Sequence, residues 1–186
     1  MSDDTHDLSQ LAPDDATRHA VACVERLLAQ MKAGECLEAR KAVEAVKANS
    51  PDADQRCEEA ADAVPNLRRC ADLSNECPPG WPDDDGPWAW LALAKITEAA
   101  SMVVRDPTRA LGLIDSAAHD LTYGNTALRD AERRWRRARL AALLSGTIGP
   151  DDASDPRLEV HQDDASEAEG LQEEGREAMR DSEEPA

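Results

Sequence analysis

A histidine and an aspartate stand side by side at His119 and Asp120, in a stretch whose apolar spacing predicts a helix. Such a pair could supply two ligands of a hydrolytic metal centre, but that centre would need further histidines and carboxylates. The chain offers only His6, His19 and His161 besides. We therefore interpret the pair as ordinary helical residues and keep a metal-dependent hydrolase only as a second alternative.

Five cysteines are the next candidates for metal binding. Cys57, Cys70 and Cys77 are separated by 12 and 6 residues, so they lack the closely paired C-x2-C spacing typical of zinc sites. Cys23 and Cys36 are expected to pack as small hydrophobic residues. The sequence therefore predicts no metal and no cofactor.

Three consecutive aspartates, Asp83, Asp84 and Asp85, stand between Pro82 and Gly86. A calcium loop instead alternates its ligands around a glycine and closes with a glutamate, so we interpret the triplet as an acidic loop tip and keep it as a candidate partner-binding site. The chain has no P-loop, no G-x-G-x-x-G and no G-x-S-x-G motif. We predict a protein that is not an enzyme.

The segment from Leu128 to Leu144 carries six arginines around one tryptophan. On a helix, one narrow stripe is apolar and includes Trp135, the expected anchor to the core. A neighbouring face is cationic, and its members are our other candidate partner-binding residues: Arg129, Arg133, Arg136 and Arg137. The apolar stripe consists of Leu128, Ala131, Trp135, Ala138 and Ala142.

Three explanations of this cationic face remain open. Acidic neighbours could neutralise it, either at i,i+4 spacing, as in Asp130 with Arg134 and Glu132 with Arg136, or from adjacent helices. The acidic C-terminal tail could dock on it, or a partner could bind there. A protein partner is favoured over nucleic acid, because the chain has a net charge of -18 and would oppose a phosphate backbone.

The acidic charge is concentrated at the two ends of the chain. Residues 1–15 hold five aspartates and no lysine or arginine, and residues 147–186 hold 14 acidic and three basic residues, a charge of -11. Residues 16–146 hold 20 acidic and 18 basic residues, a charge of -2. Salt adaptation would spread carboxylates over the folded surface, so this segregation instead indicates acidic tails on a balanced domain.

We therefore divide the chain into a disordered acidic segment, 1–13, a helical domain, 14–146, and a disordered acidic tail, 147–186, which has too few apolar residues for a core. The N-terminus does not resemble a signal peptide. The most apolar stretch, 88–104, is interrupted by Lys95 and Glu98, which argues against a membrane span. With an odd number of cysteines, these features favour the cytoplasm.

Residues typical of helix starts and ends, together with the lack of alternating strand patterns, predict an all-α fold. We expect one Ala-rich bundle, or stacked helical hairpins, with about six main helices. Pro65 is expected to bend or end the third helix, and Ser50 with Pro51 to begin it. The expected helices are 14–32, 35–48 with Leu37, Val43 and Val46 inward, 51–65 with a short turn at 66–73, 88–105, 107–122, and a last one ending at Gly146.

Four segments in this order resemble bacterial immunity proteins of polymorphic toxin systems: AVACVERLL from Ala20, EARKAVEAVKA from Glu38, AAHDLTY from Ala117 and ERRWRRARL from Glu132. The resemblance covers about residues 16–144, but not the loop 74–86 or the C-terminal tail. It implies a small helical protein that binds a cognate toxin and neutralises it. The alternative is a helical scaffold or adaptor with an acidic docking or autoinhibitory tail.

Overall fold

In the computed structural model, the described residues are 10–29, 36–76, 78, 86–121 and 126–147, with side chains from 130 onward in the last range. Within these ranges the chain forms six helices and no strand, so the predicted all-α fold is confirmed. The helices are α2 (Pro13–Ala29), α3 (Leu37–Lys47), α4 (Ala53–Leu73), α5 (Gly86–Met102), α6 (Pro107–Leu121) and α7 (Thr126–Leu144). The predicted acidic tail lies outside the described residues.

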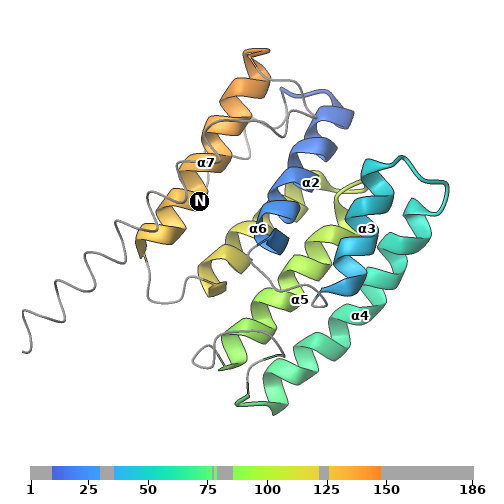
Figure 1. Cartoon of the computed structure of the whole chain (residues 1–186), viewed down its shortest axis with the longest axis vertical. Helices are drawn as coiled ribbons and strands as arrows, with labels where there is room; N and C mark the ends of the chain where they lie inside the picture. Colours follow the sequence, from blue (N-terminus) through green and yellow to red (C-terminus); the bar gives the residue numbers. More distant parts are fainter. Residues whose placement is uncertain (1–9, 30–35, 77, 79–85, 122–125, 148–186) are drawn as a thin grey trace, which may run out of the picture.

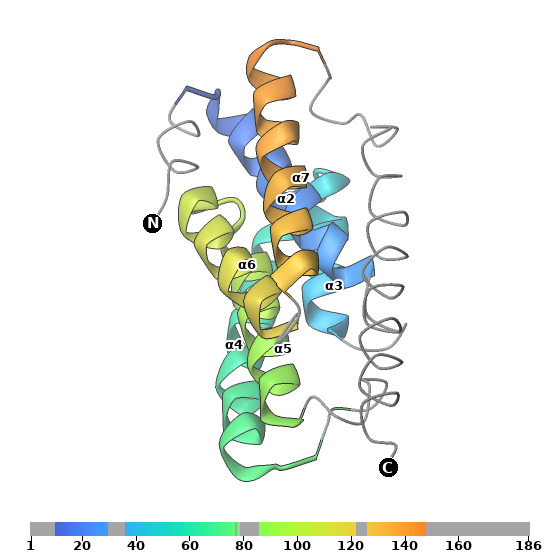
Figure 2. The ribbon, with the colours of Figure 1, turned by 90° about the vertical axis from the view of Figure 1, so that its left-hand side faces the viewer.

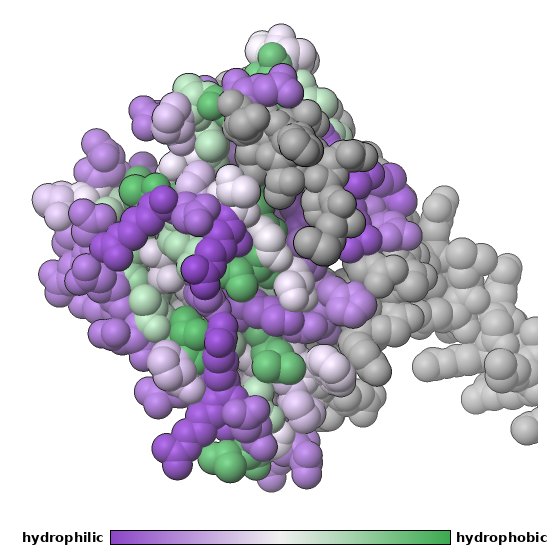
Figure 3. Space-filling view, turned by 180° about the vertical axis from the view of Figure 1, so that it is seen from behind, coloured by the Kyte–Doolittle hydropathy of each residue, from purple (hydrophilic) through white to green (hydrophobic). Residues whose placement is uncertain are grey.

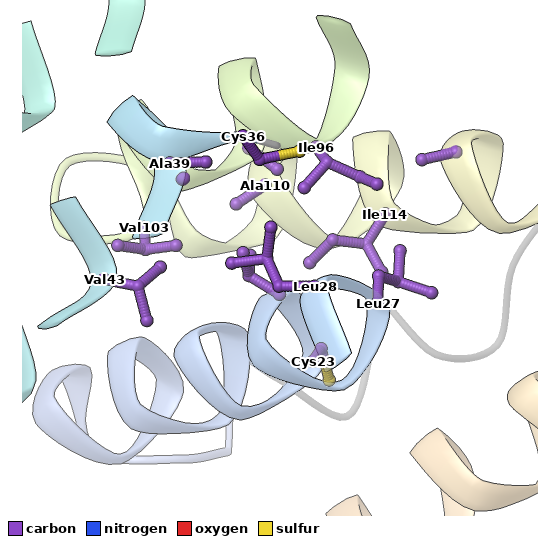
Figure 4. Packing of buried hydrophobic residues seen from close by; sticks show 14 of the residues in the cluster. Cys23, Leu27, Leu28, Cys36, Ala39, Val43, Ile96, Val103, Ala110 and Ile114 are labelled. Carbon is purple, nitrogen blue, oxygen red and sulfur yellow. The ribbon is translucent and has the colours of Figure 1, made fainter. Parts of the chain in front are cut away.

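Helix α5 lies at the centre of the bundle and contacts α2, α3, α4 and α6 (Figure 1). This position follows from its composition, because nine of its residues are buried and seven of these are alanine, serine or threonine, alongside Leu93 and Ile96. Small side chains let neighbouring helices approach closely. The core cluster is shared by α2 to α6, and Figure 4 shows Leu27, Leu28, Ile96 and Ile114 converging in it.

Helix α7 lies on the outside of this arrangement, next to α2 and α6 (Figures 1 and 2). Among the described residues it contributes only Trp135 to the core cluster. Its C-terminal stop is as expected, since Gly146 adopts a φ of 66° and Thr147 donates its amide to the carbonyl oxygen of Ala142 at 2.9 Å.

Of the two outcomes predicted for Pro65, a bend or an end of the helix, the end is wrong, because α4 continues through Pro65 to Leu73. Pro65 is exposed, so its ring points away from the bundle, and tertiary packing of α4 on α5 and α3 overrides the local cost of the proline. The start of α4 also differs from the prediction. Asp52, not Ser50, occupies the N-cap position, and the Ser50 hydroxyl donates a hydrogen bond to the Asp52 carboxylate.

Leu37 is another wrong prediction, since it is 47% exposed at the start of α3. The helix buries Ala39, Ala42 and Val43 instead, and Val46 is partly buried against the core. The beginning of α6 agrees with the sequence, because Asp106 accepts the amide hydrogen of Arg109 at 2.9 Å, as a capping aspartate does.

Candidate functional site

The side chains of α7, the helix that carries the six arginines, are arranged differently from the sequence prediction. Ala131, Trp135 and Ala142 are buried as expected, but the buried side of α7 also includes charged residues: Glu132, Arg136 and Arg139. Arg136 is 8% exposed, so placing it on a solvent-facing cationic surface was wrong. Arg137 is exposed and Arg133 is half-buried. Arg129 belongs to α7, but its side chain lies outside the described part.

An ion pair joins the first and last described helices. Arg26 of α2 donates its Nε hydrogen to Oε2 of Glu132 on α7 at 2.9 Å, and the two side chains are only 9% and 3% exposed. The same guanidinium lies 4.4 Å from the centroid of the Trp135 ring, within the range of a cation–π interaction. Arg139 lies 6.0 Å from that centroid. Trp135 is therefore the anchor that the sequence predicted, but its neighbours are charged.

Asp115 of α6 supplies the counterion for two of the candidate arginines. Its carboxylate accepts bonds from Arg133 at 3.2 Å, through both oxygens, and from Nη2 of Arg136 at 2.6 Å. Burial raises the pKa of Asp115, but the hydrogen bonds and charges of Arg133 and Arg136 outweigh burial and hold the pKa below its usual range. Of the three explanations of the cationic face, neutralisation by an adjacent helix therefore accounts for Arg133 and Arg136.

His19 of α2 is buried in the same layer, 2% exposed, with its Nε2 atom 3.8 Å from the sulfur of Cys23. Burial and, after it, the charges of Arg139 and Arg136 lower the pKa of His19 to about 4. Burial raises the pKa of the Cys23 thiol to about 12. His19 is thus neutral at pH 7, facing two arginines of α7.

The α2–α7 layer leaves several buried polar atoms unsatisfied. Within the described residues no hydrogen-bond acceptor reaches Nη2 of Arg26 or Nε1 of Trp135, and Nδ1 of His19 also lacks a partner. Such atoms each cost about 1–3 kcal/mol relative to hydration. These atoms therefore lower the net stabilisation that the contact between α2 and α7 provides.

Sequence reasoning did not identify Arg26, Asp115 or Arg139 as members of this layer. One signal was available in α2, where Ala16, His19, Cys23 and Arg26 recur at helical spacing as a second stripe beside the apolar one. Figure 4 shows the consequence, with the Cys23 sulfur pointing away from Leu28 and Ile96. No pattern along the chain could have indicated that this stripe meets α7.

The His119 and Asp120 side chains do not share a site. His119 is exposed, whereas Asp120 is 3% exposed and accepts a hydrogen bond from Nζ of Lys95 on α5 at 2.6 Å. Adjacent residues of a helix point about 100° apart, which explains the separation. Asp120 acts here as the counterion that joins α6 to α5.

Across the described ranges, no group of three or more histidine, cysteine or acidic side chains is arranged to hold a metal ion. Cys23, Cys36, Cys57 and Cys70 are free thiols, and the first three are buried. Their burial agrees with the prediction that Cys23 and Cys36 pack as small hydrophobic residues. Cys77 and the candidate aspartates Asp83, Asp84 and Asp85 lie outside the described residues.

The end of the bundle where α4 stops and α5 begins exposes two large apolar side chains. Leu73, the last residue of α4, is 73% exposed, and Trp88, in the first turn of α5, is 40% exposed. A hydrogen bond links the chain after α4 to α5, because Nε1 of Trp90 donates to the Glu76 carbonyl oxygen at 2.8 Å. Asp72 directly precedes Leu73 in the chain and Glu76 follows it by three residues, and both are exposed. We call these four residues, Leu73, Trp88, Asp72 and Glu76, the α4–α5 tip.

Figure 3 shows that the rear face of the molecule is largely hydrophilic, with apolar groups in small separate patches, one of them at the end where α4 stops and α5 begins. No described helix is both long and apolar enough to cross a membrane. Comparison of the chain with protein-family models, with curated proteins and with solved structures finds no match.

Proposed function

We propose that this chain is a non-enzymatic protein-binding module and that the α4–α5 tip is its principal contact surface. The observation that supports this proposal is the exposure of Leu73 and Trp88 beside acidic residues. Tryptophan is enriched at the energetically dominant positions of protein interfaces, and a polar rim around an apolar centre is the usual arrangement. The tip flanks the segment that contains Asp83, Asp84 and Asp85, so the candidate aspartates and the apolar pair belong to neighbouring parts of the chain.

The partner that best matches the tip is a protein with a basic surface, because the exposed residues Asp72 and Glu76 lie close to Leu73 in the chain and complementary charge speeds encounter. The finer proposal is that the partner is a bacterial toxin and that the chain is its cytoplasmic immunity protein. The resemblance of the helical segments to immunity proteins supports this version. A stoichiometric inhibitor needs a folded domain that presents a binding surface, and a helical bundle is suited to that role.

The first test is co-expression of the chain with the products of adjacent genes. Rescue of growth from a toxic neighbouring product would support the immunity proposal, and purified complex formation with the same product would identify binding as the mechanism. A neighbourhood without any toxic product would contradict the immunity proposal. Binding to a product that is not toxic would support the proposal of a protein-binding module and contradict the immunity proposal.

For a partner identified in this way, Trp88→Ala and Leu73→Ala are each expected to weaken binding at least about tenfold, the loss typical of a well-packed interface residue. Val104→Ala is the matched control, since Val104 is 45% exposed but follows α5 at its opposite end. All three variants should melt near the wild-type temperature. Equal affinities for the Val104 and Trp88 variants, measured by calorimetry, would rule out the α4–α5 tip.

The alternative is a scaffold or adaptor whose acidic tail docks on the arginines of α7, of which Arg137 is exposed and Arg129, Arg133 and Arg136 complete the predicted set. Deleting residues 147–186 removes a charge of -11 and, under this alternative, should increase binding of the domain to a polyanion such as heparin at low salt. Arg137→Gln should remove the increase. Unchanged heparin binding after the deletion would exclude tail docking.

A further inference from the structure

The contact of α7 with the rest of the bundle combines apolar residues, Trp135 among them, with several buried or half-buried charges. Across this contact Arg26 pairs with Glu132, and Asp115 pairs with Arg133 and Arg136. The contacts among α2 to α6 also include ion pairs, such as Lys95 with Asp120, but they are centred on the apolar core cluster, to which α7 adds only Trp135 among the described residues. Removing α7 would therefore leave most of the apolar core cluster in place, whereas removing α5 would disrupt it.

Water would also satisfy atoms that the docked α7 leaves without partners. The described chain provides no hydrogen bond to Nη2 of Arg26, Nε1 of Trp135 or Nδ1 of His19, and all three atoms lie at or beside the α2–α7 contact. Hydration of these atoms favours the open form. Apolar burial and ion pairing favour the docked form, so the balance between the two forms is sensitive to one added charge.

His19 can acquire that charge. The titratable and charged groups around it come from both helices: Cys23 and Arg26 on α2, and Glu132, Arg136 and Arg139 on α7, with Asp115 of α6 bonded to Arg136. Protonated His19 would face two arginines with 2% of its surface exposed to water. Opening of the α2–α7 contact would hydrate the imidazolium and separate it from Arg136 and Arg139.

We infer that α7 is a detachable helix, released from α2 and α6 as a unit when His19 is protonated, while α2 to α6 remain folded. The pKa of His19 is about 4 with α7 docked and returns to its ordinary 6.5 once the ring is hydrated. Because burial lowers the pKa of His19 in the docked form, His19 binds a proton more readily in the open form. Docking is therefore strongest above pH 6.5 and weakens as pH falls from 6.5 towards 4.

Between pH 7 and pH 5 these two values predict that the equilibrium constant for α7 opening rises about 20-fold. Asp115 does not produce this rise, because its pKa lies below the ordinary 3.8 and it stays ionised throughout the interval. Cys23 stays protonated, since its pKa is about 12. The interval from pH 7 to pH 5 therefore isolates the contribution of His19 from those of Asp115 and Cys23.

Native-state hydrogen exchange of the full chain tests the inference. After correction for intrinsic exchange rates, α7 amides should open about 20-fold more often at pH 5 than at pH 7. At both pH values they should open far more often than α5 amides, which exchange only when the core unfolds. His19→Gln should abolish the pH dependence, whereas His119→Gln, which alters an exposed histidine of α6, should retain it. Simultaneous opening of α5 and α7, or a pH dependence that survives in His19→Gln, would overturn the inference.

A measurement on the wild type keeps the inference testable if His19→Gln does not fold. The imidazole of His19 can be followed by NMR while α7 opening is followed through its amides. Proton uptake by His19 should occur together with α7 opening. Titration of His19 near pH 6.5 while α7 amides remain protected would contradict the inference.

Discussion

Replacing Glu132 with alanine is expected to lower the free energy of unfolding by about 3–5 kcal/mol, because the change removes one partner of a buried ion pair. Glu132 is 3% exposed, and its partner Arg26 has a side chain 9% exposed. Without Glu132 the Arg26 guanidinium loses its carboxylate while Arg136 and Arg139 remain buried nearby. Urea unfolding followed by circular dichroism gives the value directly.

Two controls separate this effect from a general loss of charge. Glu25→Ala breaks the pair between Glu25 and Lys47, in which the side chains are 39% and 54% exposed, and it should cost less than about 1 kcal/mol. The double variant Arg26→Met with Glu132→Met should unfold within about 1–2 kcal/mol of the wild type, because both members of this pair are replaced and neither is left buried alone. A Glu132→Ala cost no larger than that of Glu25→Ala would contradict the burial of this pair.

Ile96→Ala is expected to destabilise the protein by about 2–5 kcal/mol, the usual range for an isoleucine truncated in a packed core. Ile96 is 0% exposed on the central helix α5, and Figure 4 shows it between Cys36 and the side chains of α2 and α6. Helices on several sides limit how far the site can collapse, so the loss includes a cavity contribution. The urea midpoint should fall with little change in the slope of the transition.

Leu73→Ala is the matched control for Ile96→Ala, since it shortens a side chain that is 73% exposed. Its expected cost is within about 0.5 kcal/mol. The two truncations remove aliphatic groups of similar size, so their difference measures burial. Similar costs for both would mean that Leu73 is covered in solution, which would also weaken the proposal for the α4–α5 tip.

The fold could be predicted from the sequence because helical periodicity and end signals are local. Asp106 before Pro107 marked the start of α6, and Gly146 marked the end of α7. Predictions failed where tertiary packing outweighed a local signal. Pro65 is tolerated inside α4, and Leu37 is exposed although leucine usually packs inward. In both cases the packing of a whole helix face outweighs the structural preference of a single residue.

The candidate site was predicted less well, because it depends on pairs that are remote in the sequence. Periodicity placed Arg133 and Arg136 near the same face of α7, and both do bind one carboxylate. The identity of that carboxylate, Asp115, depends on how α6 packs on α7. Hydropathy also misled the assignment of α7, since a charged residue was taken to face solvent, whereas Glu132 and Arg139 are buried against α2.

The ion pair between Arg26 and Glu132 joins residues 106 positions apart, so it has a consequence for synthesis of the chain. On the ribosome, α2 emerges early and α2 to α6 can assemble their apolar core before α7 is made. During that interval His19, Cys23 and Arg26 face water, which suits a charged and polar surface better than it would suit an apolar one. Helix α7 can then dock on the bundle already formed by α2 to α6. Until it docks, the nascent bundle exposes charged and polar side chains at this contact.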